Sequence, residues 1–245
     1  MRSIRETTPV ATIARDIATD LDDISLMWQS SLFGATEPVI DAGFGGLQRR
    51  WLDETSWVDT LPNWLGAADH VFGELFAGLP WRQRTVTMWE RVLPEPRLTH
   101  WWDGSDGDGE ALPVLGDIRL ALSERYSRRF DTIGYNLYRD GRDSVAWHGD
   151  RERFTHEDPV VAIVSVGAAR NFMVRPRGGG SSRTFSVGHG DLLVMGGACQ
   201  HDWEHCVPKV ARSVGPRLSI MFRHDLNEPL PPDLLPIDTA AQIPV

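Results

Sequence analysis

The sequence predicts an α+β protein with a core rich in β-strands. Amphipathic helical patterns occur in the first half of the chain, and short apolar, β-branched runs follow one another after Phe130. Turns rich in glycine or polar residues separate these runs, as is typical of a sandwich or a barrel. The 245 residues suffice for a sizeable buried core, and no strong linker divides the chain, so we expect one structural domain.

Two helices are predicted before the strand-rich region. Residues 64–78 place apolar side chains at helical spacing, and Gly78 with Pro80 two residues later predicts the end of that helix. A second helix is predicted over residues 112–129, with Leu120 among its apolar positions. Between the two helices, residues 85–92 are predicted to form a strand.

Six apolar runs predict the strands of the core. The segments between them, such as R-D-G-R-D and R-G-G-G-S-S, carry the glycines and polar residues that favour chain reversal. The six predicted strands are residues 132–138, 159–166, 171–175, 183–187, 191–195 and 217–223.

Charge is distributed unevenly along the chain. The formal net charge is −9, which by itself argues against a polyanionic partner. However, residues 1–80 carry −7 and residues 224–245 carry −4, whereas residues 81–223 carry +2, from 19 arginines and one lysine against 18 acidic residues. A local basic face is therefore possible on an acidic protein.

The two cysteines, Cys199 and Cys206, are too few for a disulfide framework. We expect them to be small packing residues of a monomeric protein in a reducing, cytoplasmic setting. The first ten residues have no apolar core behind their arginines, so we expect no secretory signal. Apolar runs stay well short of the roughly 20 residues that a membrane helix needs, so we expect no membrane contact.

A His-Gly-Asp tripeptide at residues 148–150 raises the question of a metal site. In an extended segment, residues i and i+2 point to the same face, so His148 and Asp150 could present an imidazole and a carboxylate together. Gly149 between them leaves room for close approach. Such a tripeptide also arises by chance, and taken alone it is more often a polar turn.

Residues further along the chain could complete such a site. Two more histidines, His201 and His205, precede the segment R-L-S-I-M-F-R at residues 217–223. In an alternating strand, Arg217 and Arg223 of that segment share one face. Two histidines and one carboxylate form the facial triad of non-haem iron(II) oxygenases, and a buried arginine suits the far end of a dicarboxylate cosubstrate.

In these motifs the chain resembles the AlkB family of iron(II)- and 2-oxoglutarate-dependent dioxygenases. The motifs that carry the resemblance, in the family's order, are N-L-Y-R-D-G at 136–141, H-G-D-R-E at 148–152, W-E-H-C-V-P at 203–208 and R-L-S-I-M-F-R at 217–223. The segment P-R-L-T-H-W-W-D-G at 96–104 is similar, more loosely, to the lid that precedes the family's barrel. Ser219 and Met221 stand where the family usually has Asn and often has Thr.

The resemblance implies a role for individual residues. The implied Fe(II) ligands are His148, Asp150 and His205, with His201 left outside the ligand set. The residues implied for 2-oxoglutarate are Asn136, Tyr138, Arg217, Ser219 and Arg223. The residues implied for the substrate are Glu152, Arg97, Trp101 and Trp102. The two tryptophans would stack on a flipped base, and the alternative for both is packing in the core.

The resemblance also implies a jelly roll, or double-stranded β-helix, as the catalytic core. Within the single domain we expect four segments. They are a lead segment at 1–35, an N-terminal extension with helices and a nucleotide-recognition lid at 36–130, the jelly-roll core at 131–224 and a C-terminal tail at 225–245.

The reaction implied by the resemblance uses Fe(II), 2-oxoglutarate and O2. It would remove N-alkyl groups, such as those of 1-methyladenine and 3-methylcytosine, from DNA or RNA bases, with release of an aldehyde, succinate and CO2. The alternative is the same chemistry on a protein or a small molecule, which the overall acidity favours. A jelly-roll binding module without iron is disfavoured, because the ligand and arginine positions form a complete set.

Overall fold

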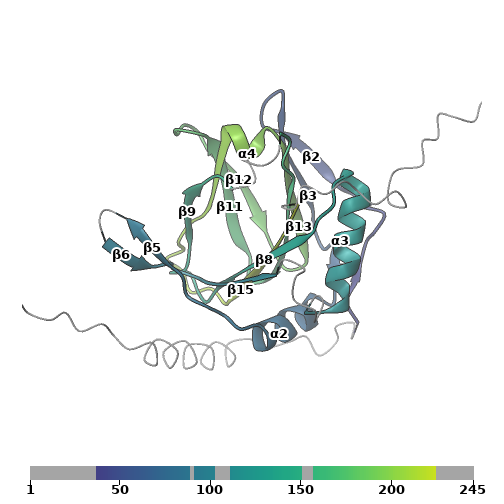
Figure 1. Ribbon diagram of the computed structural model, residues 1–245, viewed down its shortest axis with the longest axis horizontal. Helices are drawn as coiled ribbons and strands as arrows, with labels where there is room; N and C mark the ends of the chain where they lie inside the picture. The colour runs from purple at the N-terminus through teal and green to yellow at the C-terminus, as the bar shows by residue number, and fades with distance from the viewer. Residues whose placement is uncertain (1–36, 89–90, 103–110, 151–156, 225–245) are drawn as a thin grey trace, which may run out of the picture.

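The computed structural model describes residues 37–88, 91–102, 111–150 and 157–224, and its β-rich architecture confirms the predicted fold class. Eight strands from the second half of the chain form two sheets that enclose a common interior as a jelly roll (Figure 1). These strands are β8 (Thr132–Tyr138), β9 (Val145–His148), β10 (Val161–Gly167), β11 (Arg170–Pro176), β12 (Arg183–Val187), β13 (Asp191–Gly197), β14 (Trp203–Val207) and β15 (Arg217–Arg223).

The chain passes back and forth between the two sheets. The larger sheet has the order β2-β3-β13-β10-β15-β8-β7, and the smaller one has the order β12-β11-β14-β9. Because β8 and β15 lie in the larger sheet while β9 and β14 lie in the smaller one, segments from both ends of the core meet in one interior. All the pairings within both sheets are antiparallel.

Strands from the first half of the chain extend the larger sheet. Strand β3 pairs with β13 at one edge and carries β2, while β7 pairs with β8 at the other. The bounds of the early strands are β1 (Val39–Ile40), β2 (Gln48–Trp51), β3 (Ser56–Leu61), β4 (Leu65–Gly66) and β7 (Leu98–Trp102). The larger sheet thus takes strands from both sides of the boundary expected at residue 131. The expected lead segment and tail lie outside the described residues.

The hydrophobic core has two parts, one on each face of the larger sheet. Alternation along β10 sends Val164 to the outer face and Ile163 to the interior of the roll. The outer part packs against helices α2 (Ala68–Gly78) and α3 (Pro113–Tyr126), which lie outside the ring of strands (Figure 1). The inner part lines the roll and supplies the apolar support of the site described below.

Both predicted helices exist but are shorter than expected. Helix α2 begins at Ala68 because Leu65 and Gly66 pair with β1 instead, and Ala67 takes a left-handed conformation with φ of 50°. Helix α3 ends at Tyr126, since Ser127 is also left-handed. The prediction that Leu120 is an apolar packing position of this helix was wrong, because its side chain is 45 % exposed.

The strand predicted at residues 85–92 is two strands. Strands β5 (Thr85–Met88) and β6 (Arg91–Pro94) form an antiparallel hairpin that projects from the ring of strands (Figure 1). The short helix α4 (Cys199–Asp202) leads into β14, and Cys199 and Cys206 are both free and buried. Among the described residues, no helix is long and apolar enough to cross a membrane.

Candidate metal and cosubstrate site

Two histidines and one carboxylate meet where β9 and β14 pair. His148 ends β9 and lies opposite His205 of β14 in the strand register, so their ring centres are 4.3 Å apart. Asp150 follows two residues after His148, and its carboxylate lies 3.9 Å from His148 Nε2 and 3.8 Å from His205 Nε2. The ligand atoms of all three lie within 4.8 Å of one another, a spacing that one metal ion can close.

Hydrogen bonding sets the tautomer of His148. Its Nδ1 lies 2.9 Å from the carbonyl oxygen of Ala146 and 3.1 Å from that of His205. Carbonyl oxygens only accept hydrogen bonds, so Nδ1 carries a hydrogen, and Nε2 is the ring nitrogen that remains for a metal ion on the side of Asp150. The ring of Phe172 stacks on His205 with centres 5.2 Å apart, which fixes the plane of the second imidazole.

The protonation states of His205 and Asp150 suit metal binding. Burial lowers the pKa of His205 to about 3, so this imidazole is neutral at pH 7. Burial alone would raise the pKa of Asp150, but Arg223 and the two histidines outweigh it and lower the value to about 2. Arg223 donates from Nη2 to Asp150 Oδ1 at 3.0 Å. Neutral imidazoles and an ionised carboxylate are the forms that bind a metal ion.

Arg217 places a buried cation in the same interior. Its side chain is 1 % exposed, its Nε donates to Ser165 Oγ at 2.8 Å, and its guanidinium carbon lies 5.2 Å from the ring centre of Tyr138. Its Nη1 is buried and has no hydrogen-bond partner among the described residues. Burial lowers the pKa of Arg217 and raises that of Tyr138. A buried guanidinium with an unused donor calls for an anionic ligand.

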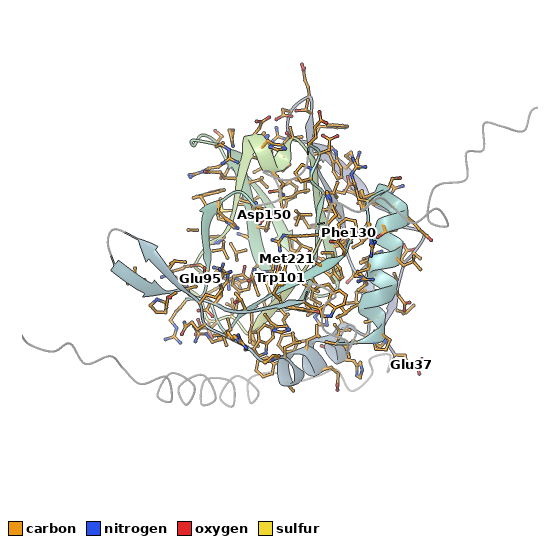
Figure 2. The ribbon with its side chains drawn as sticks, viewed as in Figure 1. Glu37, Glu95, Trp101, Phe130, Asp150 and Met221 are labelled. Carbon is orange, nitrogen blue, oxygen red and sulfur yellow. The ribbon has the colours of Figure 1, made fainter. Side chains whose placement is uncertain are left out.

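The triad and Arg217 line one cavity of about 1140 Å³. Alternating residues of two paired strands build its wall. Strand β15 contributes Arg217, Ser219, Met221 and Arg223, and β8 contributes Gly134, Asn136 and Tyr138, with Tyr135 as an additional lining residue. Figure 2 shows Asp150, Met221 and Trp101 within the ring of strands, with Glu95 toward the β5–β6 hairpin. The cavity therefore joins the candidate metal ligands to the arginine wall and extends to Val86 of β5.

Comparison with known proteins is consistent with this geometry. Residues 79–223 match the 2OG-Fe(II) oxygenase superfamily. The chain is 34 % identical over 183 residues to the mouse alpha-ketoglutarate-dependent dioxygenase alkB homolog 3, which covers 67 % of this chain and 64 % of that protein. It is 30 % identical over 177 residues to the human DNA oxidative demethylase ALKBH2, covering 64 % of this chain and 68 % of that one.

The chain belongs to the AlkB family of 2OG-Fe(II) oxygenases. It spans about two thirds of the length of these curated relatives, 64 % for the mouse homologue and 63 % for the human alkB homolog 3. Among solved structures, OsALKBH1 superposes with a TM-score of 0.50 at 14 % identity, covering 72 % of this chain and 100 % of that one, which supports the fold.

The residues present fit the two groups that the family uses. His148, Asp150 and His205 offer the donor set of a non-haem Fe(II) site. The unused Nη1 of Arg217 can donate to the far carboxylate of 2-oxoglutarate, because a guanidinium cation and a carboxylate anion attract each other. Ser219, which departs from the family's usual residue, is 3 % exposed and lines the cavity beside Arg217.

Two of the expected substrate residues lie at the mouth of the cavity. Arg97 pairs with Glu95 at 3.0 Å and donates from Nε to Asn136 Oδ1 at 3.2 Å. Trp101 is 44 % exposed, and the guanidinium carbon of Arg223 lies 5.5 Å from its ring centre. Gly134 makes this packing possible, because a Cβ there would lie 2.8 Å from Cζ3 of Trp101.

Trp102 corrects one expectation. Because neighbours along a strand face opposite ways, Trp102 packs against the outer hydrophobic core and under Arg119, at 5.0 Å, and does not line the cavity. It takes the core-packing role that was the alternative for both tryptophans. Glu152 lies outside the described residues. His201 is outside the triad, and its Nε2 lies 2.9 Å from the carbonyl oxygen of Glu157.

Three supporting residues were not anticipated from the sequence. Ser165 orients Arg217, and Gln200 accepts a hydrogen bond from the backbone N–H of Asp150 at 3.3 Å. Arg170 is 3 % exposed and donates to the backbone carbonyls of Asp140, Asp143 and Pro208, which fixes the loop between β8 and β9. An arginine in the run R-N-F-M-V-R gives no signal of such a role, since arginines usually lie on the surface.

Proposed function

We propose that this protein is an Fe(II)- and 2-oxoglutarate-dependent dioxygenase that removes N-alkyl groups from nucleic-acid bases, such as 1-methyladenine and 3-methylcytosine. The observation that carries the proposal is one cavity that joins a His-Asp-His cluster to a buried arginine with an unused donor. The products would be succinate, CO2, an aldehyde and the restored base. The relatives named as an alpha-ketoglutarate-dependent dioxygenase and a DNA oxidative demethylase support the reaction class and a DNA substrate.

Each side chain has a task in this proposal. His148, Asp150 and His205 hold the metal, and Arg223 keeps the carboxylate of Asp150 ionised and oriented by its 3.0 Å contact. Bound Fe(II) with 2-oxoglutarate and O2 would supply the oxidising power for hydroxylation of an N-alkyl carbon. The protein contacts to 2-oxoglutarate are assigned to five residues that line the cavity: Asn136, Tyr138, Arg217, Ser219 and Arg223.

The substrate side of the cavity is assigned to Trp101 and Arg97, with Glu152 as a third contact. Trp101 is partly exposed and lines the same cavity as the triad, so an extruded base could stack on its ring. The wall around the metal ligands is apolar, with Ile163, Phe172 and Val145, so a bound base would displace water from the reacting carbon.

A substrate panel tests this function directly. Oligonucleotides with 1-methyladenine or 3-methylcytosine, single- and double-stranded, are incubated with the protein, Fe(II) and 2-oxoglutarate, and succinate and formaldehyde are measured. We expect both products with at least one methylated oligonucleotide and no formaldehyde with the unmethylated control. Consumption of 2-oxoglutarate without formaldehyde from any of them would end the base-repair proposal and keep the oxygenase.

The net charge of −9 favours a second candidate, the same chemistry on a protein or a small molecule. A methylated peptide in the same formaldehyde assay separates the two. Turnover of the peptide in preference to every methylated oligonucleotide would support this second function.

A further inference from the structure

The segment that leads into β5 forms an outer wall of the cavity. Arg82, Arg84 and Val86 all line the cavity, and they are alternate residues of one extended stretch. Between them, Gln83 turns the other way and donates from Nε2 to the carbonyl oxygen of Glu95 at 3.0 Å. Both arginine side chains therefore face the cavity from the same side of the segment.

Main-chain hydrogen bonds hold both arginines in place. Arg82 exchanges two backbone hydrogen bonds with Thr99 of β7, at 3.0 and 2.8 Å, and the carbonyl oxygen of Arg84 accepts one from Glu95 at 2.7 Å. The preceding residue, Trp81, is buried and donates from Nε1 to the carbonyl oxygen of Phe76 in α2. The segment is thus fixed on both sides, and only the guanidinium groups remain to be ordered by a ligand.

These two guanidinium groups are available charges. Arg82 and Arg84 are exposed, and within the described part of the chain neither has an acidic partner or a side-chain hydrogen bond. The third arginine at this mouth, Arg97, is already committed to Glu95 and Asn136. The protein has a net charge of −9, so two uncompensated cations beside one cavity give this part of the surface a charge opposite to that of the whole chain.

We propose that Arg82 and Arg84 bind two neighbouring backbone phosphates of the nucleic-acid strand whose base enters the cavity. The inference rests on the proposed function and deepens it, since it assigns a backbone contact that no motif indicates. Alternate residues of an extended segment lie about 6.6 Å apart, which suits successive phosphates of one strand. Guanidinium groups match phosphate geometry, and contacts of this kind fix position on the strand without reading sequence.

Salt dependence of binding tests the proposal. A fluorescein-labelled single-stranded oligonucleotide with one 3-methylcytosine is titrated with protein at several salt concentrations, and anisotropy gives the dissociation constant. Binding weakens as salt rises, and for single strands each phosphate contact contributes about −0.7 to the slope of log K against log salt. The double variant Arg82→Gln with Arg84→Gln should therefore reduce the magnitude of this slope by about 1.4. We also expect weaker binding by about tenfold or more at low salt.

Two controls make the test specific. Arg212→Gln removes an exposed arginine outside the cavity and should leave the slope unchanged. Arg82→Lys with Arg84→Lys keeps both charges and should restore most of the slope, because lysine also binds phosphate as a point charge. Melting temperatures of all variants check the fold, which exposed arginines without described partners should hardly affect.

The outcomes separate this inference from the proposed function. If the oligonucleotide is demethylated but the double glutamine variant keeps the wild-type slope, the phosphate contact is wrong and the function stands. If the slope falls as expected but no methylated base is turned over, the contact stands and the function is wrong. A loss of slope in Arg212→Gln as large as in the double variant would show a diffuse charge effect and overturn the contact.

Discussion

Arg217 is a buried cation to which the protein supplies only part of its hydrogen bonding. Nε is satisfied by Ser165 at 2.8 Å, whereas Nη1 is left without a partner among the described residues. Arg217→Lys keeps the charge and removes the planar fork, so one charge-assisted hydrogen bond to 2-oxoglutarate should be lost. Such a bond contributes about 1.5–3 kcal/mol, which corresponds to about 10–150-fold weaker binding of 2-oxoglutarate.

Calorimetric titration of the Mn²⁺-loaded protein with 2-oxoglutarate measures this effect. Arg212→Lys, on the surface away from the cavity, is the matched control. An unchanged dissociation constant in Arg217→Lys would mean that another cation receives the far carboxylate.

Gly134 and Trp101 form a pair that a double-mutant cycle can resolve. A Cβ at residue 134 would lie 2.8 Å from Cζ3 of Trp101 and 3.0 Å from Nη1 of Arg223, so Gly134→Ala should displace the indole. If Trp101 stacks on the base, Trp101→Ala should weaken oligonucleotide binding by about 1–3 kcal/mol. Gly134→Ala should then weaken binding in the wild type and have little further effect in the Trp101→Ala background. Anisotropy measures all four proteins, and strictly additive effects would argue against the coupling.

The residues of the candidate site could be selected from the sequence because their order carries more information than any one motif: His148, Asp150, His205, Arg217 and Arg223. Alternation also predicted correctly that Arg217 and Arg223 share one face, opposite Leu218 and Ile220. Ser165 could not be found this way, since it lies in an apolar run and contacts Arg217 only through the pairing of β10 with β15. Trp101 and Trp102 could be separated only by the register of β7 against β8.

At the scale of elements, the two faces of strand β15 have different roles: one packs in the outer hydrophobic core and the other lines the cavity. Ile220 is fully buried in the outer core beneath the helices, whereas its neighbour Ser219 faces the cavity. Ile220→Ala should lower the free energy of unfolding by about 2–5 kcal/mol through lost burial and a cavity. Ser219→Ala should change stability much less and weaken 2-oxoglutarate binding instead. Urea denaturation and calorimetry measure the two quantities, and equal destabilisation by both variants would contradict this division.

The turn between β2 and β3 connects to the ligand-bearing strand through Asp53. Its carboxylate accepts hydrogen bonds from Nε1 of Trp203 in β14 at 2.7 Å and from the backbone N–H groups of Thr55 and Ser56. Desolvation alone would raise the pKa of Asp53, which is an exposed residue, but these hydrogen bonds lower it to about 2 from 3.8. A depressed carboxyl pKa contributes stability that is complete above pH 3.8 and is lost as pH falls toward 2.

Asp53→Asn should therefore melt below the wild type at pH 6, and the difference should shrink at pH 3. Melting curves followed by circular dichroism at the two pH values check the sign. A difference that grows on acidification would contradict the assignment of the lowered pKa to the folded state.

The strands that carry the candidate metal ligands were the hardest elements to predict. The six runs predicted from apolar content are β8, β10, β11, β12, β13 and β15, each within one or two residues of the observed bounds. Strands β9 (V-A-W-H) and β14 (W-E-H-C-V) were not among them, because they exchange apolar residues for ligands and polar groups. The hairpin of β5 and β6 was read as one strand, since no Gly or Asn-Gly pair marks its turn.

At the scale of the whole molecule, the fold concentrates positive charge on one cavity of an acidic chain. Five arginines of three separate segments line this cavity, because β7, β8 and β15 are neighbours in one sheet: Arg82 and Arg84 before β5, Arg97 before β7, and Arg217 and Arg223 in β15. The excess of positive charge over residues 81–223 could be counted in the sequence. The face on which these arginines gather could not be predicted, because it depends on strand register. In this jelly roll, the first and last strands of the core, β8 and β15, lie side by side, so arginines far apart in the sequence face one interior.

The same convergence predicts that a bound metal ion would raise the global stability of the fold. The triad unites β9, the segment after it and β14, so a bound ion would stabilise the folded state and not the unfolded chain. A ligand at 100 times its dissociation constant adds about 2.7 kcal/mol, and for a chain of this size each kcal/mol raises the melting temperature by about 2–4 °C. Mn²⁺, which replaces Fe(II) without turnover, should thus raise the melting temperature by about 5–11 °C in the wild type, and a chelator should reverse the shift.

Two histidine variants test whether the triad is the metal site. His148→Ala should abolish the increase in melting temperature, whereas His201→Ala, a histidine outside the triad, should keep it. Differential scanning calorimetry with and without Mn²⁺ compares the three proteins, and an equal loss in both variants would place the metal elsewhere.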